Sequence, residues 1–525
     1  MNSEYELAVK LQRRLNKASN NQKGPSPRAS RPSFVLPIEI PIQQCSATDL
    51  MNVFLQHIEY NSVICCSHEH FEPSPTRKFA VCRSIFMSYF LIVQVCGENC
   101  MSRSSLVSGF YKLRPKERLA FVKEFAGLSD EECALLTNTG SLPLDLADRM
   151  IENVVGAIPI PLGIAVNFLI NNRDRLIPMA IDEPSVVAAA SYAAKMAREG
   201  GGFRTSSTPP IMIGQIQTVG VEDPYAAKIR IIEAKEEILK KANEQDPVLV
   251  SVGGGAKDLD AKVIDTTCGQ MLITELHVDC RDAMGANAVN TMAEAVAPMI
   301  EQITGGRVYL RIISNLATKR LARAWCRVPK EAIGGEEVVD GIVNAYAFAA
   351  ADPYRAATHN KGILNGVIAV VVATCNDHRA IEAGAHAYAA RSGRYSTLST
   401  WEKDKNGDLV GSVELPMAVG LIGGAVRTHP IAKIALKILG VKTANEFGEV
   451  LAAVGLAQNL GALRALAHEG IQRGHMSLHA RNIAVAAGAA GELIDLVAER
   501  MVEERKIRMD KAKELLEKYK ATGKL

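Results

Sequence analysis

The stretch LITELHVDCRDAMGANAVNTMAEAVAPMIEQI (272–303) changes its hydrophobic period midway. In its first nine residues, apolar side chains alternate with Glu275, His277 and Asp279, which is the period of two expected of a strand. From Ala286 the apolar residues follow the period of a helix, and a Gly–Gly pair ends that pattern. The stretch therefore predicts a strand, a turn of small residues and a helix.

The sequence around this stretch forms one unit over 209–315. We expect strands at 211–219, 248–252, 272–280 and 307–314, and helices at 222–245 and 286–303. The order strand, helix, strand, strand, helix, strand is the split arrangement of ferredoxin-like domains. No GxGxxG motif follows a strand, so the unit is not a doubly wound dinucleotide fold.

The chain on either side predicts a second, larger mixture of helices and strands. We expect helices at 114–127, 128–140 and 499–520, strand-like sequence at 152–170, and a strand, turn and helix over 178–202. Ser129 with Glu132 forms the capping-box pattern of a helix start. Asn406 and Gly407 predict a hairpin turn, whereas the ligand spacing of a calcium loop breaks down at Val413.

The composition excludes several classes of protein. With 525 residues, of which 48% are hydrophobic, the chain can build two or three domains with substantial cores. A net charge of +3 and 5% aromatic residues argue against a nucleic-acid surface. The eleven cysteines do not resemble a disulfide framework, which favours a reducing, cytoplasmic location. We expect no metal.

The first hundred residues differ from the rest of the chain in composition and sequence pattern. Residues 17–37 are rich in Ser, Pro, Asn and Arg, which predicts disorder. CCSHEH (65–70) offers soft metal ligands but lacks the spacing of a zinc site. IFMSYFLIVQVC (85–96) is apolar but too short to cross a bilayer as a helix. We therefore treat 1–104 as an extension without a membrane anchor.

Three polar residues lie in stretches otherwise dominated by Ala, Val, Ile, Leu and Gly: Lys361 in HNKGILNG, Asp377 in ATCNDHRA, and His475 in RGHMSLHARN. Burying such groups is costly unless they pair or perform chemistry. Lys361 can form an ion pair with Asp377, stabilise a developing oxyanion, or do both. Asn365 would share the face of Lys361 on a helix. His475 is either a surface histidine or a mobile general acid.

Two helix starts offer further candidates. Glu183, in IDEPSV, either caps a helix or, in an apolar pocket, donates a proton. DAMGAN (282–287) is either a tight strand-to-helix turn or a place where Gly285 and Ala286 let a phosphate approach a helix N-terminus. The local sequence leaves both pairs of alternatives open.

Seven motifs taken in order resemble those of hydroxymethylglutaryl-CoA reductases of the soluble class II type, typical of bacteria and archaea. They are ENVVGAIPIPLG, DEPSVVAAAS, DAMGANAVNTMAEA, ISNLA, DPYRAATHNKGILNG, ATCNDHRA and GIQRGHMSLHARN. The resemblance covers roughly 105–525. It implies an enzyme that interconverts 3-hydroxy-3-methylglutaryl-CoA and mevalonate plus CoA through mevaldyl-CoA and mevaldehyde, using two nicotinamide hydrides.

The resemblance also assigns roles to residues. The catalytic positions fall on Glu183, Lys361, Asp377 and His475. The substrate contacts fall on Ser185, Arg355, Asn365 and Asn315, with coenzyme A bound as part of the substrate. The cofactor turn comprises Asp282, Ala283, Met284, Gly285, Ala286 and Asn287. Asp246 corresponds to the aspartate that contacts the adenosine ribose in NADH-preferring members, so NADH is favoured and NADPH is the alternative.

The same resemblance implies a fold class and an assembly. We expect an α+β protein with a large mixed α/β substrate domain (105–208 and 316–472), an inserted ferredoxin-like cofactor domain (209–315) and a helical C-terminal flap (473–525). The family builds its sites between paired subunits, so a homodimer or higher homo-oligomer is implied. The competing hypothesis is a non-catalytic CoA-binding or scaffold protein that keeps this fold.

Overall fold

The computed structural model describes residues 104–469 and 471–523, with side chains left out over 468–478. Close contacts divide the chain into Met1–Met101 and Ser102–Leu525, and the fold below is that of the second unit. The disorder predicted at 17–37, the CCSHEH motif and the apolar segment 85–96 lie outside the described residues.

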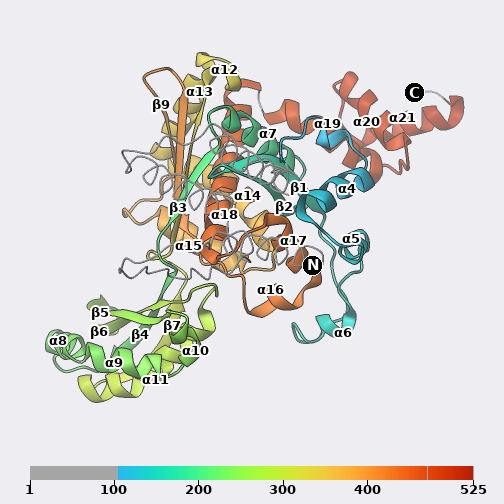
Figure 1. Cartoon of the computed structure of the whole chain (residues 1–525). Coiled ribbons are helices and arrows are strands. Elements are labelled where there is room, and N and C mark those ends of the chain that lie inside the picture. The colour runs from blue at the N-terminus through green and yellow to red at the C-terminus, as the bar shows by residue number, and fades with distance from the viewer. Residues whose placement is uncertain (1–103, 470, 524–525) are drawn as a thin grey trace, which may run out of the picture. The chain divides into compact units, whose positions relative to one another are not determined.

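Residues 211–314 form a four-stranded sheet in the order β5-β6-β4-β7, with every neighbouring pair antiparallel. Helices α8, α9 and α11 cover one face of this sheet (Figure 1). The element order confirms the predicted ferredoxin-like arrangement. The bounds are β4 Ile211–Val219, α8 Pro224–Glu233, α9 Lys235–Asn243, α10 Pro247–Ser251, β5 Gly255–Thr266, β6 Gly269–Asp279, α11 Ala286–Thr304 and β7 Arg307–Ser314.

Two details of this unit correct the prediction. The strand expected at 248–252 is wrong, because Asp246 accepts a hydrogen bond from the N–H of Leu249 and Pro247 occupies the first helical position, which together start α10. The second strand is β5, which begins at Gly255. The long helix expected at 222–245 is divided at Ala234 into α8 and α9.

The larger of the two sheets has six strands in the order β2-β1-β3-β8-β10-β9. Strand β3 precedes the four-stranded unit in the chain and β8 follows it, yet the two strands pair antiparallel. The smaller sheet is therefore inserted between neighbouring strands of the larger one, which confirms the predicted α+β class. The bounds are β1 Leu162–Ile170, β2 Arg173–Ala180, β3 Phe203–Ser207, β8 Leu321–Val328, β9 Ser399–Lys403 and β10 Leu409–Pro416.

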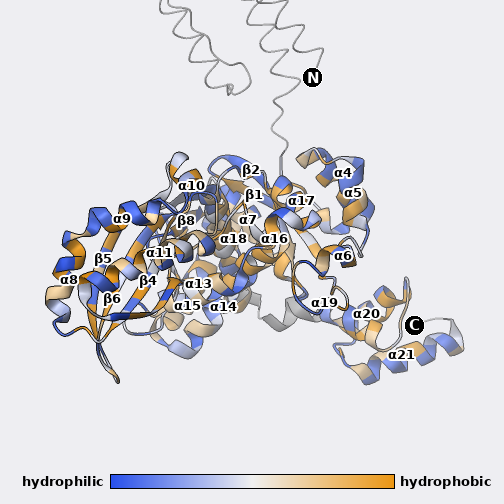
Figure 2. Ribbon diagram, turned by 90° about the horizontal axis from the view of Figure 1, so that it is seen from below, coloured by the Kyte–Doolittle hydropathy of each residue, from blue (hydrophilic) through white to orange (hydrophobic). Residues whose placement is uncertain are grey.

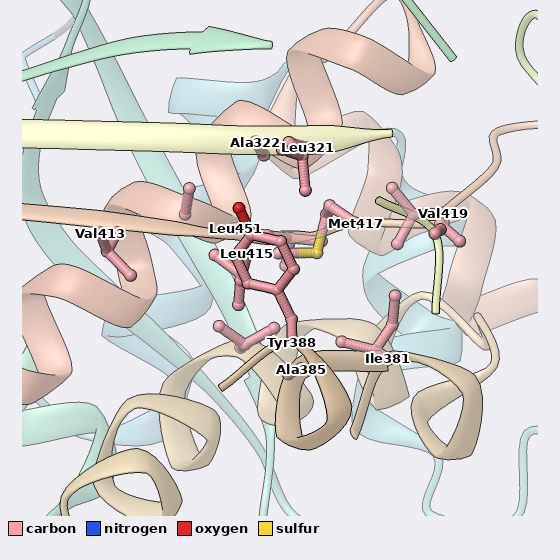
Figure 3. Packing of buried hydrophobic residues seen from close by; sticks show 14 of the residues in the cluster. Leu321, Ala322, Ile381, Ala385, Tyr388, Val413, Leu415, Met417, Val419 and Leu451 are labelled. Carbon is pink, nitrogen blue, oxygen red and sulfur yellow. The ribbon is translucent and has the colours of Figure 1, made fainter. Parts of the chain in front are cut away.

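Helices α7, α14 and α18 pack against this sheet, and α13 and α15 contact them or its strands. Figure 3 shows one part of the core, where Ile381 and Tyr388 of α15 lie near Leu415 and Met417. The helix over Ala444–Ala467 is long and apolar enough to cross a membrane, but 67% of its apolar window is buried inside the protein, as expected of a core helix. The bounds are α7 Val186–Glu199, α13 Glu336–Ala351, α14 Pro353–Ala373, α15 His378–Ala389 and α18 Ala444–Arg464.

The first described helices follow their sequence signals. Ser129 and Glu132 form the predicted capping box, and Gly127 ends the preceding helix with a φ of 63°. The strand-like reading of 152–170 is wrong in its first half, because only Leu162 onward enters a strand. The remaining short elements are η2 Phe110–Lys112, α4 Pro115–Ala126, α5 Asp130–Thr137, α6 Leu144–Ala147, α12 Lys330–Ile333, α16 Gly424–Thr428, α17 Pro430–Leu439 and η3 Ala465–Glu469.

The C-terminal segment comprises α19 Ile471–Ala486, α20 Leu493–Glu503 and α21 Met509–Thr522. The helix predicted at 499–520 is therefore interrupted, and Arg505 between its two parts has a φ of 53°. Buried apolar residues on the three helices form a cluster of their own, which includes Val497, Met501 and Leu515. Figure 2 shows α20 and α21 with hydrophobic and hydrophilic residues on different sides, as expected of amphipathic helices.

Candidate active site

Lys361 projects from the middle of α14 toward the segment that leads into α7. Its Nζ atom lies 2.9 Å from Oε2 of Glu183. Asn365, one turn further along α14, places its Nδ2 atom 3.5 Å from the same oxygen. The structure thus confirms that Lys361 and Asn365 share a helix face, and it brings both to Glu183 from a distant part of the chain.

This ion pair is more open than we expected. The side chain of Lys361 is 59% exposed and that of Glu183 is 40% exposed in the single chain. A pair so accessible to water contributes little to stability. The apolar sequence around Lys361 predicts a buried lysine, and this prediction is wrong for the isolated chain. Strong electrostatic stabilisation at Lys361 requires that something else cover it.

Asp377 has a different set of partners from the one we expected. Its Oδ1 atom accepts hydrogen bonds from the backbone N–H groups of Arg379 and Ala380, at 3.1 and 3.2 Å, and from Nε of Arg379 at 3.0 Å. Burial opposes ionisation of this carboxyl, but these hydrogen bonds outweigh it and hold its pKa below the ordinary value. In the described part of the chain, Asp377 caps α15 and makes no ion pair with Lys361, so the structure does not show the ion pair that the sequence left open as one alternative.

The face of α14 opposite Lys361 carries a polar network that sequence reasoning missed. Nε2 of His359 lies 2.7 Å from Oγ of Ser399, and this hydroxyl donates to Oδ1 of Asn459 at 2.9 Å. Nε1 of Trp401 donates to the same oxygen at 2.6 Å. Asn360 adds bonds to the Ser396 carbonyl and the Leu398 N–H. The only sequence signal was two polar residues directly before Lys361.

The hydrogen bonds of this network determine the tautomer of His359. The indole N–H of Trp401 can only donate, so the atom of Asn459 that it meets is the amide oxygen. Ser399 gives its proton to that oxygen, so the hydroxyl must accept from Nε2–H of His359. Burial, and secondarily the charge of Arg355, lowers the pKa of His359 to about 3. The imidazole is therefore neutral, with its proton on Nε2.

Of the expected substrate-binding residues, Asn365 contacts Glu183, whereas Arg355, Ser185 and Asn315 make no contact with the Lys361–Glu183 pair in the described part of the chain. Arg355 is on the first turn of α14, where its backbone N–H donates to Asp352, and burial lowers the pKa of its guanidinium. Ser185 starts α7 with a φ of 76°, and its buried Oγ atom has no hydrogen-bond partner in the described part of the chain. Asn315 is exposed, directly after β7, and its carbonyl packs against Gly384 of α15.

The expected cofactor turn, 282–287, leads from β6 into α11. Gly285 has a φ of 111°, and a Cβ atom there would lie 2.4 Å from Sγ of Cys280, so only glycine fits. No side chain caps α11, so the first amides of that helix are available to an anionic group. Oδ1 of Asp282 accepts the backbone N–H of Ala444 at 2.8 Å, so this carboxylate holds the turn against the start of α18. These features fit a dinucleotide phosphate.

Asp246 and His475 complete the expected set. Oδ1 of Asp246 caps α10 by accepting the N–H of Leu249 at 2.8 Å, so part of this carboxylate has a structural role. His475 lies in α19, and its side chain is among those not described. Within the described residues, no three His, Cys, Asp or Glu side chains gather in a way that could hold a metal ion.

Comparison with solved structures defines the class of protein. The chain matches a 3-hydroxy-3-methylglutaryl-coenzyme A reductase from Streptococcus pneumoniae with 41% identity and a TM-score of 0.68, covering 78% of this chain and 100% of the other. A second structure from that organism, a class II reductase bound to NADPH in open conformations, matches with 40% identity and a TM-score of 0.67 over 78% and 100% of the two chains.

The sequence comparisons then identify the family. Residues 114–480 match the family model of hydroxymethylglutaryl-coenzyme A reductase. A 3-hydroxy-3-methylglutaryl-coenzyme A reductase from Archaeoglobus fulgidus is 64% identical over 425 residues, which is 81% of this chain and 97% of that protein. A probable reductase from Borreliella burgdorferi is 36% identical over 65% and 78% of the two chains. The chain belongs to the hydroxymethylglutaryl-coenzyme A reductase family.

Proposed function

We propose that this chain carries out its family's reaction, the interconversion of 3-hydroxy-3-methylglutaryl-CoA and mevalonate plus CoA by two successive hydride transfers through mevaldyl-CoA and mevaldehyde. The observation that carries the proposal is the contact of Lys361 and Asn365 with one carboxylate oxygen of Glu183. A bound nicotinamide cofactor supplies the hydrides. The chain must then manage the negative charge and the protons that these transfers create.

Lys361 is suited to the first charge that forms. When hydride adds to the thioester carbon, the carbonyl oxygen becomes an oxyanion, and an ammonium group beside it lowers the barrier. Cleavage of the C–S bond then releases CoA as a thiolate, which His475 protonates. When hydride adds to the aldehyde carbon, Glu183 must carry a proton; it gives this proton to the new alkoxide and is left as the carboxylate that pairs with the ammonium group 2.9 Å away.

Asp377 and the substrate-binding residues support this chemistry from nearby elements. The low pKa of Asp377 keeps it ionised at neutral pH, so it adds a fixed negative charge that tunes the network. Arg355, Ser185, Asn365 and Asn315 are proposed to contact the substrate. The unpartnered, buried hydroxyl of Ser185 supports its assignment, because a buried hydroxyl group without a partner is costly unless a ligand satisfies it.

We also propose that a second copy of this chain covers the site. The single chain leaves Lys361 largely exposed, although the proposed chemistry needs a water-poor environment. The loop before β1 exposes a run of large apolar residues, with Ile151 at 66%, Val155 at 98% and Ile158 at 92%. Such a run favours a protein interface. Sedimentation or light scattering should find a dimer or larger assembly, and a monomer at assay concentration would contradict this proposal.

The proposed binding roles are divided between the domains of the fold. The large domain, 105–208 with 316–472, is proposed to bind the CoA substrate, and the small domain, 209–315, to bind the cofactor. Residues 473–525 act as a flap that carries His475, residues 1–104 form a dispensable extension, and the protein works in the cytoplasm. We favour NADH, because a carboxylate at Asp246 would repel the 2′-phosphate of NADPH.

One assay separates this function from a non-catalytic CoA-binding or scaffold role. Purified full-length protein is mixed with mevalonate, CoA and either NAD or NADP, and the absorbance of the reduced nicotinamide is followed. We expect reduction, faster with NAD than with NADP. No reduction with either cofactor, from a protein that is folded by circular dichroism, would favour the scaffold role.

A further inference from the structure

Arg320, in the segment between β7 and β8, is buried and binds three backbone carbonyls. It is 4% exposed. Its Nη1 atom donates to the carbonyls of Ala283 and Met284, at 3.0 Å each, and its Nη2 atom donates to that of Val419 at 2.6 Å. Two of the three acceptors belong to the proposed cofactor turn.

This guanidinium has no carboxylate partner in the described part of the chain. The acidic residues whose charges reach it are Asp279 and Asp282. Asp279 lies beside Arg281, whose Nε atom is 3.6 Å away, and Asp282 accepts the Ala444 N–H. A buried cation without a counterion is costly to keep. A methionine could fill similar space without that cost, so the charge and the three donated bonds point to a role beyond packing.

We propose that Arg320 is a positioning residue for cofactor binding, and this proposal rests on the function proposed above. The C=O and N–H of one trans peptide point in opposite directions. Because Arg320 binds the Ala283 and Met284 carbonyls, the N–H groups of Met284 and Gly285 point away from it. The Met284 amide faces the Ile422 carbonyl across the isolated parallel bridge between Ala283 and Ile422, whereas the Gly285 amide donates to no other group in the described residues. Arg320 therefore fixes the Gly285 amide, beside the uncapped start of α11, toward the pyrophosphate of a dinucleotide.

The same residue connects the cofactor turn to the catalytic aspartate. Its third acceptor, Val419, is followed by Gly420, whose N–H donates to Oδ1 of Asn376 at 2.8 Å. Asn376 is buried and precedes Asp377 in the chain. A side chain at Gly420 would collide with the Met284 amide, because its Cβ atom would lie 2.6 Å from that nitrogen. Turn, loop and aspartate are thus fixed to one another around Arg320.

The surrounding core makes this arrangement rigid. Leu321, directly after Arg320, and Val419 belong to the packed cluster that also holds Met417 and Ile381 (Figure 3). The backbone of Arg320 accepts the Met417 N–H at 2.9 Å. A guanidinium anchored in such a cluster keeps its geometry when a ligand arrives, and so does the turn that it holds.

The test compares Arg320→Met and Arg320→Lys with wild type by calorimetric titration with NADH and by steady-state kinetics. For Arg320→Met we expect the Kd and KM for cofactor to rise about tenfold or more. A change of this size corresponds to the loss of one hydrogen bond from the backbone amide to the charged pyrophosphate. The KM for 3-hydroxy-3-methylglutaryl-CoA should change by less than about twofold. Lysine keeps the charge but not the planar set of donors. The Kd for cofactor of Arg320→Lys should therefore lie between those of wild type and Arg320→Met.

Arg175→Met is the matched control. Arg175 is also buried and also donates to backbone carbonyls, those of Leu439 and Gly440, but it pairs with a carboxylate, Glu446, and donates to no carbonyl of the cofactor turn. This variant should lose stability and keep wild-type affinity for NADH. An equal loss of affinity in Arg175→Met, or wild-type affinity in a folded Arg320→Met, would overturn the proposal.

If Arg320→Met does not fold, Arg320→Lys decides the question, because unchanged NADH affinity in that variant also overturns the proposal. The titration is independent of turnover. A wild-type protein that binds NADH but reduces no substrate would refute the proposed function and still test Arg320.

Discussion

The two faces of α14 are built in opposite ways. On the buried face, His359 and Asn360 are 2% and 0% exposed, and their hydrogen bonds lead to fixed groups on β9 and α18. On the open face, Lys361 is 59% exposed and meets a carboxylate from another element. The buried face sets the rotation of the helix about its axis. The open face leaves its charged group accessible, on a helix that the buried hydrogen bonds hold in place.

This contrast predicts that substitutions on the two faces affect catalysis and stability differently. A change on the open face should remove catalysis and leave the fold intact, because an exposed ion pair adds little to stability. A change on the buried face should damage both, because it leaves a buried polar group unsatisfied and loosens the support of Lys361. Stability and turnover, measured together, therefore separate the two roles.

The largest effect is expected from Lys361→Ala. Removing the ammonium group should reduce turnover by a factor on the order of a hundred or more, as for other groups that stabilise a developing oxyanion. The midpoint of urea unfolding should stay near that of wild type. Turnover close to wild type would remove Lys361 from the centre of the mechanism. A large loss of stability would show that the open face also supports the fold.

A smaller loss, in both stability and turnover, is expected from His359→Leu. The substitution leaves the Ser399 hydroxyl without its donor, so the free energy of unfolding should fall by about 1–3 kcal/mol. Turnover should fall roughly tenfold because the lysine is less well placed. His359→Gln provides the matched control, since its amide N–H can replace Nε2–H. If His359→Gln behaves like His359→Leu in both measurements, the donated bond is not what matters.

The buried face should also respond to acid in a way that the open face does not. Folded His359 has a pKa of about 3, whereas an unfolded histidine titrates near ~6.5. Below that value the unfolded chain binds a proton that the folded chain rejects, so stability falls with falling pH. Above it the contribution is constant.

The free energy of unfolding, measured from pH 8 to pH 5, should show this pH dependence as a difference between wild type and His359→Gln. The difference should be flat at the alkaline end and should change by up to roughly 1.4 kcal/mol per pH unit at the acid end. The same slope in both proteins would mean that His359 is protonated in the fold. Asp377 and the other shifted groups are common to both proteins, so their contributions cancel.

Sequence reasoning recovered the features that have local signals. The alternation in 272–280, the capping box at Ser129 and the glycines that end helices each fix a structure through neighbouring residues. The strand predicted at 248–252 is wrong. The prediction followed the β-branched residues of this segment, whereas the helix start at Asp246 and Pro247 decides the structure.

The site shows the same limit. Lys361, Glu183 and Asn365 were each identified, but nothing local could reveal that Glu183 meets Lys361 while Asp377 caps its own helix. The partners of Arg320 are backbone carbonyls on two other segments, and carbonyls have no residue signature. Contacts of this kind are set by tertiary packing, which a single sequence does not display.

The smallest effect is expected at Asp246, which caps α10 and is proposed to face the cofactor. Asp246→Asn keeps an oxygen that can cap α10 but removes the charge that would repel a 2′-phosphate. Stability should remain unchanged, and the ratio of kcat/KM for NADH to that for NADPH should fall several-fold, because only the electrostatic repulsion is lost. Asp246→Ala should produce the same shift in that ratio and lose about 1 kcal/mol of stability with the cap. An unchanged ratio in both variants would leave Asp246 with the helix cap as its whole role, and the preference for NADH would then need another cause.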